Sequence, residues 1–535
     1  MQREADDIAK HYNPHVRIAR TDRVVNAAVT FAMHLGASTI MRHLIAASLV
    51  LLPFAAHAQN ASDWPSYNRT LNGQRFAPQT EITPANAANL KELCRYDLKT
   101  QSSFQTGPVV VAGTMYLTTA HATIAIDANT CAEKWRAHED YTMAIPNDTN
   151  RGVAFADGHI FRGTQDARLL AYDASTGKKL WDISLGDPKH LETTSAAILA
   201  WKGMVFTGNA GSSRMPTKGR MYGIDAATGK IIWEQYMVPR SADDKSRGPA
   251  APAPKVKGTA DEGGTPWTAF TLDEATGTLY VPGGNPSSTE DASFSVALDA
   301  KTGAVKQTYL PVKHDFHDWE VSAAPLLYTI NGKAMLASAT KDGRIYAGDI
   351  KIGKSAWTAN ATTVSNETAP LTATGPHVCP GTLGGNEWSN PAYSPATRLI
   401  YNGAVDWCAT LTSTNTSKPK ITFDAPSQAT GWVKAFNPAT GKEAWSFRTP
   451  APVVGGITPT AGNLLFAGDL GGNLYAFNAK TGDIAWKTAT GGAIGGGVIS
   501  YAIAGKQRIA VTSGMKSNTW PMASGSASIV IYGLK

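Results

Sequence analysis

The chain has 535 residues, of which 43% are hydrophobic and only 17% charged, and it contains 50 Gly and 30 Pro. This is the composition of a turn-rich globular protein, because a disordered chain carries far more charge and less apolar surface. The formal net charge is +7, but no run of five or six Lys or Arg occurs, which argues against a nucleic-acid partner.

The first feature in chain order is a candidate secretion signal. Residues 41–43 read Met-Arg-His, residues 44–54 are apolar, and residues 56–58 read Ala-His-Ala. A basic start, a short apolar stretch and a small-x-small cleavage site are the layout of a signal peptide. The pattern predicts export to an oxidising compartment, the periplasm.

This signal sets the expected domain limits. We expect Met41 to be the true start and residues 1–40 to be a wrongly assigned upstream extension. Residues 41–58 are then the signal peptide, and residues 59–535 form one mature domain that begins at Gln59. No other apolar run reaches the roughly 18 residues of a membrane span, so no span is expected in the mature chain.

An eleven-residue repeat is the strongest internal signal. It reads small-x-Asp/Asn-x-x-Thr-Gly-x-x-x-Trp, with some departures. Each copy predicts a strand, a tight turn in which the Asp caps backbone amides and Gly takes positive φ, and a second strand that ends on the Trp. The copies span residues 125–135, 171–181, 223–233, 297–307, 347–357, 435–445 and 476–486.

Two further short strands precede each copy, so the repeating unit is a four-stranded antiparallel sheet. Units of this kind stacked radially form a β-propeller. An eighth unit can be assembled from both ends of the chain, with residues 90–98 joining residues 498–503, 507–513 and 528–533. The sequence therefore predicts an all-β, eight-bladed propeller whose ring is closed by both termini, which removes open sheet edges. A stacked β-helix is the alternative, which the Trp-turn pattern disfavours.

The four cysteines predict two disulfides. Cys379 and Cys408 flank one long segment between repeats and are expected to close it. Cys94 replaces the Trp of the eighth unit and Cys131 replaces the turn Gly of the first. Since the Trp of one blade packs on the turn Gly of the next, a disulfide is expected in place of this packing. Four buried free thiols are the alternative, which export disfavours.

The repeat resembles that of the quinoprotein, or PQQ-dependent, alcohol dehydrogenases, which are eight-bladed propellers. Residues 63–68 (Asp-Trp-Pro-Ser-Tyr-Asn), 150–155 (Asn-Arg-Gly-Val-Ala-Phe) and 384–388 (Gly-Gly-Asn-Glu-Trp) extend the resemblance to nearly all of residues 63–534. It implies an enzyme that carries pyrroloquinoline quinone (PQQ) and a calcium or lanthanide ion. No Cys-x-x-Cys-His motif occurs, so no covalent c-type haem is expected in this chain.

The resemblance also implies the cofactor contacts. Trp267 matches the floor under the planar quinone, for which indole offers a flat apolar face. Arg151 matches an arginine that pairs with a cofactor carboxylate, and Lys341 matches the cation at the quinone oxygens. A core Trp, a surface Arg and an ordinary turn Lys are the alternatives. The other implied contacts are Thr193, Thr194, Ser195, Trp388 and Gln105.

The resemblance also implies which residues carry out the reaction. Residues 314–320, His-Asp-Phe-His-Asp-Trp-Glu, resemble the family's catalytic His-Asp-x-Trp-Asp loop. Asp318 matches the catalytic base and a metal ligand, and Asn285 matches another ligand; such oxygen donors suit a hard cation. Glu320 lies where lanthanide-dependent relatives carry an extra carboxylate and is a further candidate ligand. A solvated acidic loop is the alternative for the acids.

The chain departs from the family's pattern in three places. Residues 208–219, where the family has a metal-ligating Glu, contain no carboxylate, and Ser213 or Arg214 takes that position. The family's ring of adjacent cysteines over the quinone is replaced by Ile145 and Pro146, and a Glu that contacts the quinone is replaced by Gln. These losses predict a weakened metal site with the main cofactor contacts retained.

The sequence thus predicts a periplasmic PQQ-dependent dehydrogenase of alcohols or related hydroxyl compounds. Hydride would pass to the quinone, and a separate soluble cytochrome c would take the electrons. The alternative is a non-enzymatic or degenerate propeller that binds a protein or polymer, as the outer-membrane assembly scaffold of similar fold does.

Overall fold

The structure is a computed structural model in which the chain divides into two units, residues 1–56 and 57–535. It describes residues 60–141, 148–211, 217–251, 263–285, 294–312, 315–350, 354–413 and 419–535. The predicted signal peptide and both proposed starts lie outside the described residues, as do Ile145, Pro146, Ser213, Arg214 and His314. In the part of the chain that the structure describes, no helix is long and apolar enough to cross a membrane.

In the described residues, the second unit has nine sheets, of which eight are blades built on four antiparallel strands, numbered 1 to 8 in chain order, and one is a smaller, three-stranded sheet. Blades 1 and 2 comprise β2 (Val109–Val111), β3 (Thr114–Thr118), β4 (Ala122–Asp127) and β5 (Glu133–His138), then β6 (Ala154–Ala156), β7 (His159–Gly163), β8 (Arg168–Asp173) and β9 (Lys179–Ser184). Blades 3 and 4 comprise β10 (Leu199–Trp201), β11 (Met204–Asn209), β12 (Arg220–Asp225) and β13 (Ile231–Tyr236), then β15 (Thr271–Asp273), β16 (Thr278–Gly283), β17 (Phe294–Asp299) and β18 (Val305–Tyr309).

Blades 5 and 6 comprise β19 (Leu326–Ile330), β20 (Lys333–Ala339), β21 (Arg344–Asp349) and β22 (Lys354–Asn360), then β24 (Ala392–Ser394), β25 (Leu399–Asp406), β28 (Thr430–Phe436) and β29 (Glu443–Thr449). Blades 7 and 8 comprise β30 (Thr458–Pro459), β31 (Leu464–Gly468), β32 (Asn473–Asn478) and β33 (Ile484–Ala489), then β34 (Val498–Ile503), β35 (Lys506–Ser513), β36 (Ser528–Leu534) and β1 (Leu90–Asp97). Short 3₁₀ turns occur at η1 (Ala87–Asn89), η2 (Pro188–His190) and η3 (Pro426–Gln428).

The first strand of each blade is the innermost. First strands of successive blades contact one another, as β2 does with β6 and β6 with β10. The β2 side chains are largely buried, whereas the outermost strand β5 alternates between exposed and half-buried residues. Burial on both faces explains why the inner strands are short continuous apolar runs, while the outer strands alternate.

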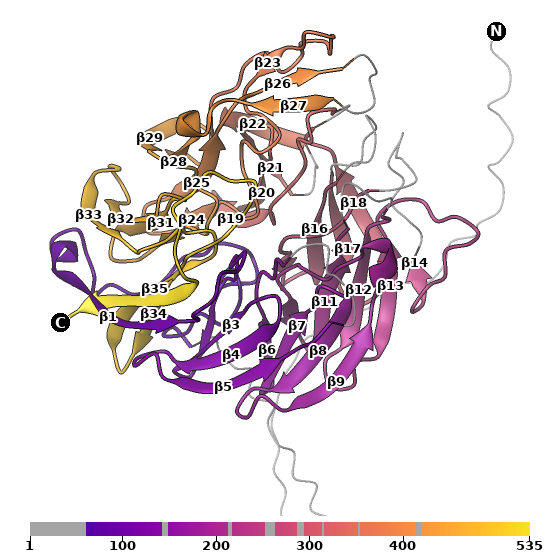
Figure 1. Ribbon diagram of the computed structural model, residues 1–535, viewed down its shortest axis with the longest axis horizontal. Helices are drawn as coiled ribbons and strands as arrows, with labels where there is room; N and C mark the ends of the chain where they lie inside the picture. The colour runs from indigo at the N-terminus through magenta and orange to yellow at the C-terminus, as the bar shows by residue number, and fades with distance from the viewer. Residues whose placement is uncertain are drawn as a thin grey trace, which may run out of the picture. The chain divides into compact units, whose positions relative to one another are not determined.

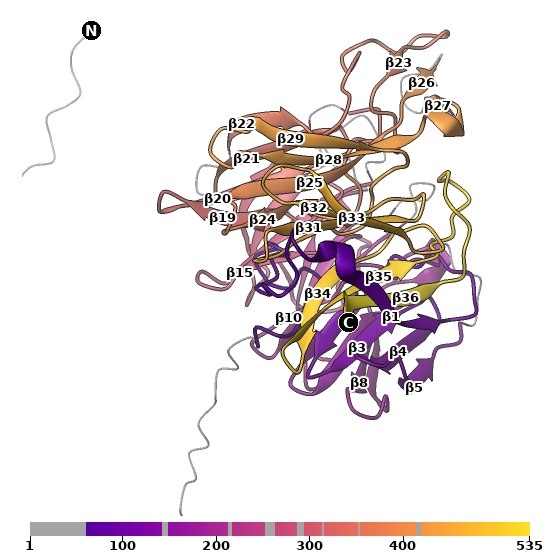
Figure 2. The same cartoon turned by 90° about the vertical axis from the view of Figure 1, so that its left-hand side faces the viewer.

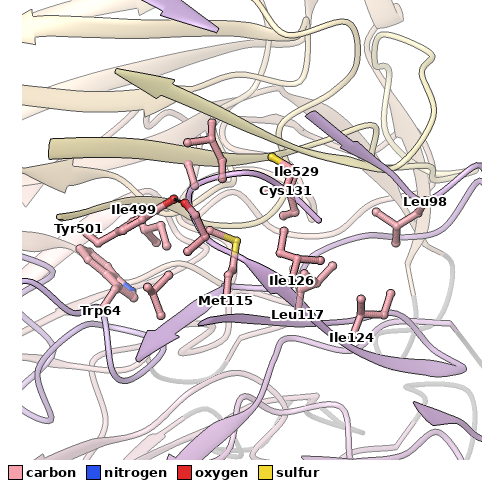
Figure 3. Packing of buried hydrophobic residues seen from close by; sticks show 14 of the residues in the cluster. Trp64, Leu98, Met115, Leu117, Ile124, Ile126, Cys131, Ile499, Tyr501 and Ile529 are labelled. Atoms are coloured by element: carbon pink, nitrogen blue, oxygen red, sulfur yellow. Dashed lines mark hydrogen bonds between the residues drawn. The ribbon is translucent and has the colours of Figure 1, made fainter. Parts of the chain in front are cut away.

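Blade 8 closes the ring as predicted. β1, from the start of the described chain, pairs with β36 from its end, beside β35 and β34. Figure 1 shows β1 next to β34 and β35, and Figure 2 shows β36 with them. A hydrophobic cluster joins each pair of neighbouring blades, including the eighth with the first. At this junction Met115 and Ile126 pack in one cluster with Ile499 and Ile529 (Figure 3).

The repeat forms the contacts between the outer parts of the blades. Trp135 Nε1 donates to the carbonyl of Ala174 in the next blade at 2.9 Å. Its ring covers Gly177, where a Cβ would collide with the indole and where φ is +72°. The Trp residues of blades 2, 3, 5 and 6 dock in the same way. Glycine is therefore required here both for its conformation and for the close approach.

Both predicted disulfides are confirmed. Cys94 and Cys131 are bonded with Cα atoms 5.9 Å apart, and Cys131 keeps the positive φ, +62°, of the Gly that it replaces. Cys379 and Cys408 are bonded at the base of an additional three-stranded sheet. This accessory sheet consists of β23 (His377–Val378), β26 (Ala409–Thr412) and β27 (Lys420–Phe423), which lie together in both views (Figures 1 and 2). A fifth strand, β14 (Ala250–Ala251), runs parallel to β13 in blade 3.

Candidate functional site

The predicted site residues share one position in the blade plan. Most of them precede the first strand of a blade, as Arg151 precedes β6 and Trp267 precedes β15. The others follow the second strand, as Lys341 follows β20 and Asn285 follows β16. Because the two strands are antiparallel, the start of one and the end of the other lie at the same end of the blade. The inner strands therefore bring these residues to one face around the axis.

Trp267 and Arg151 form the centre of the site. The guanidinium of Arg151 lies over the Trp267 ring, 4.6 Å from its centroid, and 5.7 Å from that of Trp388. Arg151 Nη1 also donates to the backbone carbonyl of Trp267 at 3.0 Å. Burial lowers the pKa of Arg151 to about 10, and its contacts are cation–π contacts, a backbone hydrogen bond and a long hydrogen bond to the Ser195 hydroxyl at 3.5 Å. An anionic ligand would supply a charged partner for this buried cation.

Lys341 joins two of the predicted acids. Its ammonium lies 2.7 Å from Asp318 Oδ2 and 3.4 Å from Glu320 Oε1. Burial alone would lower the pKa of Lys341, but Asp318 and Glu320 together raise it above its usual value. Lys341 therefore stays protonated. This lysine belongs to a buried network of charges, and the reading of it as an ordinary turn residue is wrong.

Asp318 is the more accessible of the two acids. Its side chain keeps 39% of its surface exposed, whereas that of Glu320 keeps 3%. Desolvation of the carboxyl nevertheless raises the pKa of Asp318 to about 7, with Lys341 opposing and Glu320 adding to the rise. This value lies near neutral pH, where a general base is most effective.

Glu320 connects the acids to Trp267 and Asn285. Its Oε2 accepts the backbone N–H of Asn285 and the indole N–H of Trp267, the latter at 3.3 Å. A Cβ on Gly284 would collide with this carboxylate, so glycine is needed for the approach. The Asn285 amide donates to Thr265 Oγ1 at 2.7 Å. Asn285, Asp318 and Glu320 thus lie in one connected group of hard oxygen donors.

Several buried polar atoms of the site have no protein partner. Among the described residues these are Gln105 Oε1, Arg151 Nε, Thr193 Oγ1, Thr194 Oγ1 and Glu387 Oε1. Buried polar atoms are bonded in the great majority of cases, so a group of unpaired ones at one site indicates a missing polar ligand. Such a set, with the flat face of Trp267, fits a planar cofactor that carries carbonyl and carboxylate oxygens.

Backbone hydrogen bonds of neighbouring residues show where Gln105, Thr193 and Thr194 lie in the site. Gly107, two residues after Gln105, donates to the Arg151 carbonyl at 2.9 Å. Arg151 in turn donates its backbone N–H to Ser195, beside the two threonines, at 3.2 Å. The structure therefore places these three residues next to Arg151.

Glu387 is a site residue that the motif analysis did not single out. It is buried, and burial raises its pKa to about 8 against the opposing effects of Lys341 and Arg151, while Glu320 and Asp318 add to the rise. Its position between Asn386 and Trp388, inside a segment already matched to the family, was the signal available. Trp388 is buried beside it and donates to the Gly495 carbonyl at 2.8 Å.

The segment that lacks the metal-ligating Glu is described at its two ends. Asn209 donates its side-chain amide to Glu192 Oε1 at 3.3 Å, and Arg220 forms an ion pair with the same carboxylate. Glu192 therefore brings a carboxylate close to this segment from outside it. Because Arg220 and Asn209 already bind that carboxylate, Glu192 is not a free replacement for the missing ligand.

A PQQ family model described as "Glucose/ethanol/alcohol dehydrogenase, beta-propeller domain" matches residues 64–376. A second model, described as outer membrane protein assembly factor BamB, matches residues 429–522.

Several similar proteins are named as alcohol dehydrogenases. The dehydrogenase subunit of a quinone alcohol dehydrogenase from Acetobacter aceti is 28% identical, over 86% of this chain and 71% of that protein. Quinoprotein alcohol dehydrogenase PedH from Pseudomonas putida is 28% identical, over 88% and 92%. The solved structure of quinohemoprotein alcohol dehydrogenase ADHIIG from Pseudomonas putida HK5 gives a TM-score of 0.79 at 24% identity, covering 89% of this chain and 81% of that one. A europium-containing methanol dehydrogenase gives 0.77 at 22% identity, covering 89% and 98%.

Proposed function

The chain belongs to the PQQ-dependent glucose/ethanol/alcohol dehydrogenase β-propeller family, and from this we propose that it is a periplasmic enzyme that oxidises an alcohol or related hydroxyl compound and passes electrons to a separate soluble cytochrome c. The observation that carries the proposal is the meeting of Trp267, Arg151 and Lys341 with Asp318 at one face. This combines an aromatic platform and two buried cations with a carboxylate of raised pKa, and perturbed acids beside a ligand platform are typical of functional sites.

The geometry supports a specific set of cofactor contacts. When bound, PQQ would supply the acceptor for one hydride, which carries both electrons of the oxidation. Trp267 would give the stacking face, and Lys341 and Arg151 would neutralise its negative charge. Arg151 lies over the Trp267 ring, 4.6 Å from its centroid, and its guanidinium would pair with an anionic group of the bound cofactor.

Asp318 is proposed as the base. One carboxylate oxygen of Asp318 lies 2.7 Å from the Lys341 ammonium, and its side chain keeps 39% of its surface exposed, which would leave it accessible to a substrate hydroxyl. Lys341 stabilises the ionised form of Asp318 before the reaction, and the raised pKa makes the carboxylate ready to accept the hydroxyl proton at neutral pH.

Asn285, Asp318 and Glu320 are the proposed ligands of a calcium or lanthanide ion. Amide and carboxylate oxygens are the donors that such hard cations prefer, but calcium takes 6–8 oxygen ligands, so water or other groups would have to complete the shell. Lys341 competes for both carboxylates. We therefore propose a weak metal site in which the ion and the ammonium share the same acids.

The test is titration of the purified protein with PQQ in the presence of calcium or lanthanum, followed by tryptophan fluorescence, and then dye reduction with a panel of alcohols. Quenching of the tryptophan signal and alcohol-dependent dye reduction are expected. Failure to bind PQQ at high concentration would refute the enzyme. It would favour the scaffold alternative, to which the BamB-type match over residues 429–522 gives independent support.

A further inference from the structure

The loop that carries Asp318 contains a stack of three aromatic rings. His317 lies between Phe316 and Trp319, with ring centroids 3.9 Å and 3.7 Å apart and interplanar angles of 27° and 9°. Asp318 lies between two members of this stack in the sequence. Any movement of the rings would therefore move the backbone that presents its carboxylate.

The same loop is held from within by Asp315. This buried carboxylate accepts the backbone N–H of His317 at 2.9 Å and that of Trp319 at 2.6 Å, and it also bonds His317 Nδ1 at 2.9 Å. These bonds close a tight turn in which Asp318 adopts the left-handed backbone conformation, φ +66°. Such a conformation persists only where the surroundings impose it.

The ring stack ends on the accessory sheet. Phe316 packs against Val378, Ala409 and Leu411 of β23 and β26, together with Phe423 of β27. Val378 adjoins Cys379 and Ala409 adjoins Cys408, so the disulfide joins the two strands at the point where Phe316 touches them. The accessory sheet is otherwise small, with three strands outside the blade plan.

We propose that the accessory sheet, closed by Cys379–Cys408, positions Asp318 through the stack of Phe316, His317 and Trp319. Phe316 and the two cysteines are then positioning residues, since they act on Asp318 through other groups. The expected effect on metal binding and turnover rests on the role proposed above for Asp318. The expected effect of the accessory sheet on the conformation of the Asp318 loop does not. The other disulfide, Cys94–Cys131, joins blade 8 to blade 1 and offers a matched control.

The experiment compares the double variant Cys379→Ala/Cys408→Ala with Cys94→Ala/Cys131→Ala. Hydrogen exchange of the 315–323 amides, followed by mass spectrometry, measures the coupling without any ligand. Faster exchange is expected in the first variant, because the amides of His317 and Trp319 lose their fixed turn, and unchanged exchange is expected in the second. Equal exchange in both variants and the wild type would overturn the proposal.

Terbium binding, read by luminescence sensitised by tryptophan, and the separate kcat and KM of PQQ-loaded protein test the functional consequence. Loss of the accessory disulfide should weaken terbium binding roughly 10–100-fold, as loss of groups that orient metal ligands typically does, and should lower kcat more than KM. The control variant should change only the melting temperature. Faster loop exchange with unchanged terbium affinity and kcat would overturn the positioning of Asp318.

Phe316 gives a second, milder test in case the disulfide variant folds poorly. Phe316→Tyr keeps the ring and should preserve exchange and terbium affinity, whereas Phe316→Leu keeps apolar bulk but removes the stack and should reproduce the disulfide variant. Identical behaviour of the two substitutions would refute the role of the ring stack. A wild type that binds neither terbium nor PQQ would instead refute the proposed function, and the exchange result would still decide the coupling.

Discussion

Asp318→Asn removes the proposed proton acceptor and leaves most other properties of its position intact. Asn tolerates the left-handed backbone that Asp318 adopts at φ +66°. Its amide oxygen can still accept from Lys341, which also keeps Glu320 at 3.4 Å. The lost ion pair involves a side chain that is 39% exposed, so solvent screening limits the cost in stability to about 1 kcal/mol.

The effect on turnover should be much larger than the effect on stability. Loss of a general base typically costs roughly 10²–10⁴-fold, which corresponds to about 3–5 kcal/mol in the activation barrier. PQQ titration should give nearly the wild-type affinity, and dye reduction with a saturating alcohol should show the loss. Asp299→Asn, at the half-buried end of β17 in blade 4, is the matched control and should keep full activity. A variant at position 318 that oxidises alcohol at the wild-type rate would show that Asp318 is not the base.

Four further changes test other parts of the site and fold. Trp267→Ala should weaken PQQ binding at least about tenfold by removing the stacking face, as measured by calorimetric titration; unchanged affinity would remove Trp267 as the floor. Glu320→Ala should reduce the response of activity to lanthanum more than that to calcium, and equal losses would exclude it as the discriminating ligand. Burial raises the pKa of Glu387 from 4.5 to about 8, so the folded protein holds a proton that the unfolded chain releases, and stability should fall by a few kcal/mol as pH rises from about 5 to 8. Glu387→Gln should flatten this fall in urea denaturation, and a parallel pH profile would contradict the assignment. Gln307→Trp should fill the cleft between blades 4 and 5, where the docking Trp is missing, and add about 0.5–2 kcal/mol; a lower melting temperature would show that the cleft cannot accept an indole.

The repeat was sufficient to predict the blades because each copy encodes a complete local unit. Asp173 caps the amides of Ser175 and Thr176 at 3.1 and 2.8 Å, and Gly177 adopts positive φ, as the residue types require. The Cys94–Cys131 bond was predictable in the same way. Cys94 stands at the position of a docking Trp and Cys131 at that of the turn Gly which this Trp would contact, so the repeat places the two cysteines together. The two-ended blade followed because a propeller with an open edge would expose unpaired strands.

Part of the blade geometry was not visible in the repeat. In seven blades the register between the third and fourth strands shifts at the small first residue of the repeat, as at Ala171/Tyr172, and in blade 8 the corresponding shift falls between Glu92 and Cys94. Such a bulge depends on how two strands pair. A one-dimensional pattern of turn and apolar residues predicts the strands without specifying this register.

Some features of the site follow from the order of strands and motifs along the chain, and others depend on tertiary packing. Motifs and their place before first strands or after second strands determined that Trp267, Arg151, Lys341 and Asp318 share one face, because antiparallel pairing allows no other arrangement. Only the tertiary structure decided that Lys341 bridges Asp318 and Glu320 and that Glu387 is a buried acid of the site. The contact of Phe316 with a sheet about 60–100 residues further along the chain was also beyond the sequence. The burial and ion pairing of a side chain depend on neighbours from distant segments of the chain. A local pattern of residue types therefore cannot predict them.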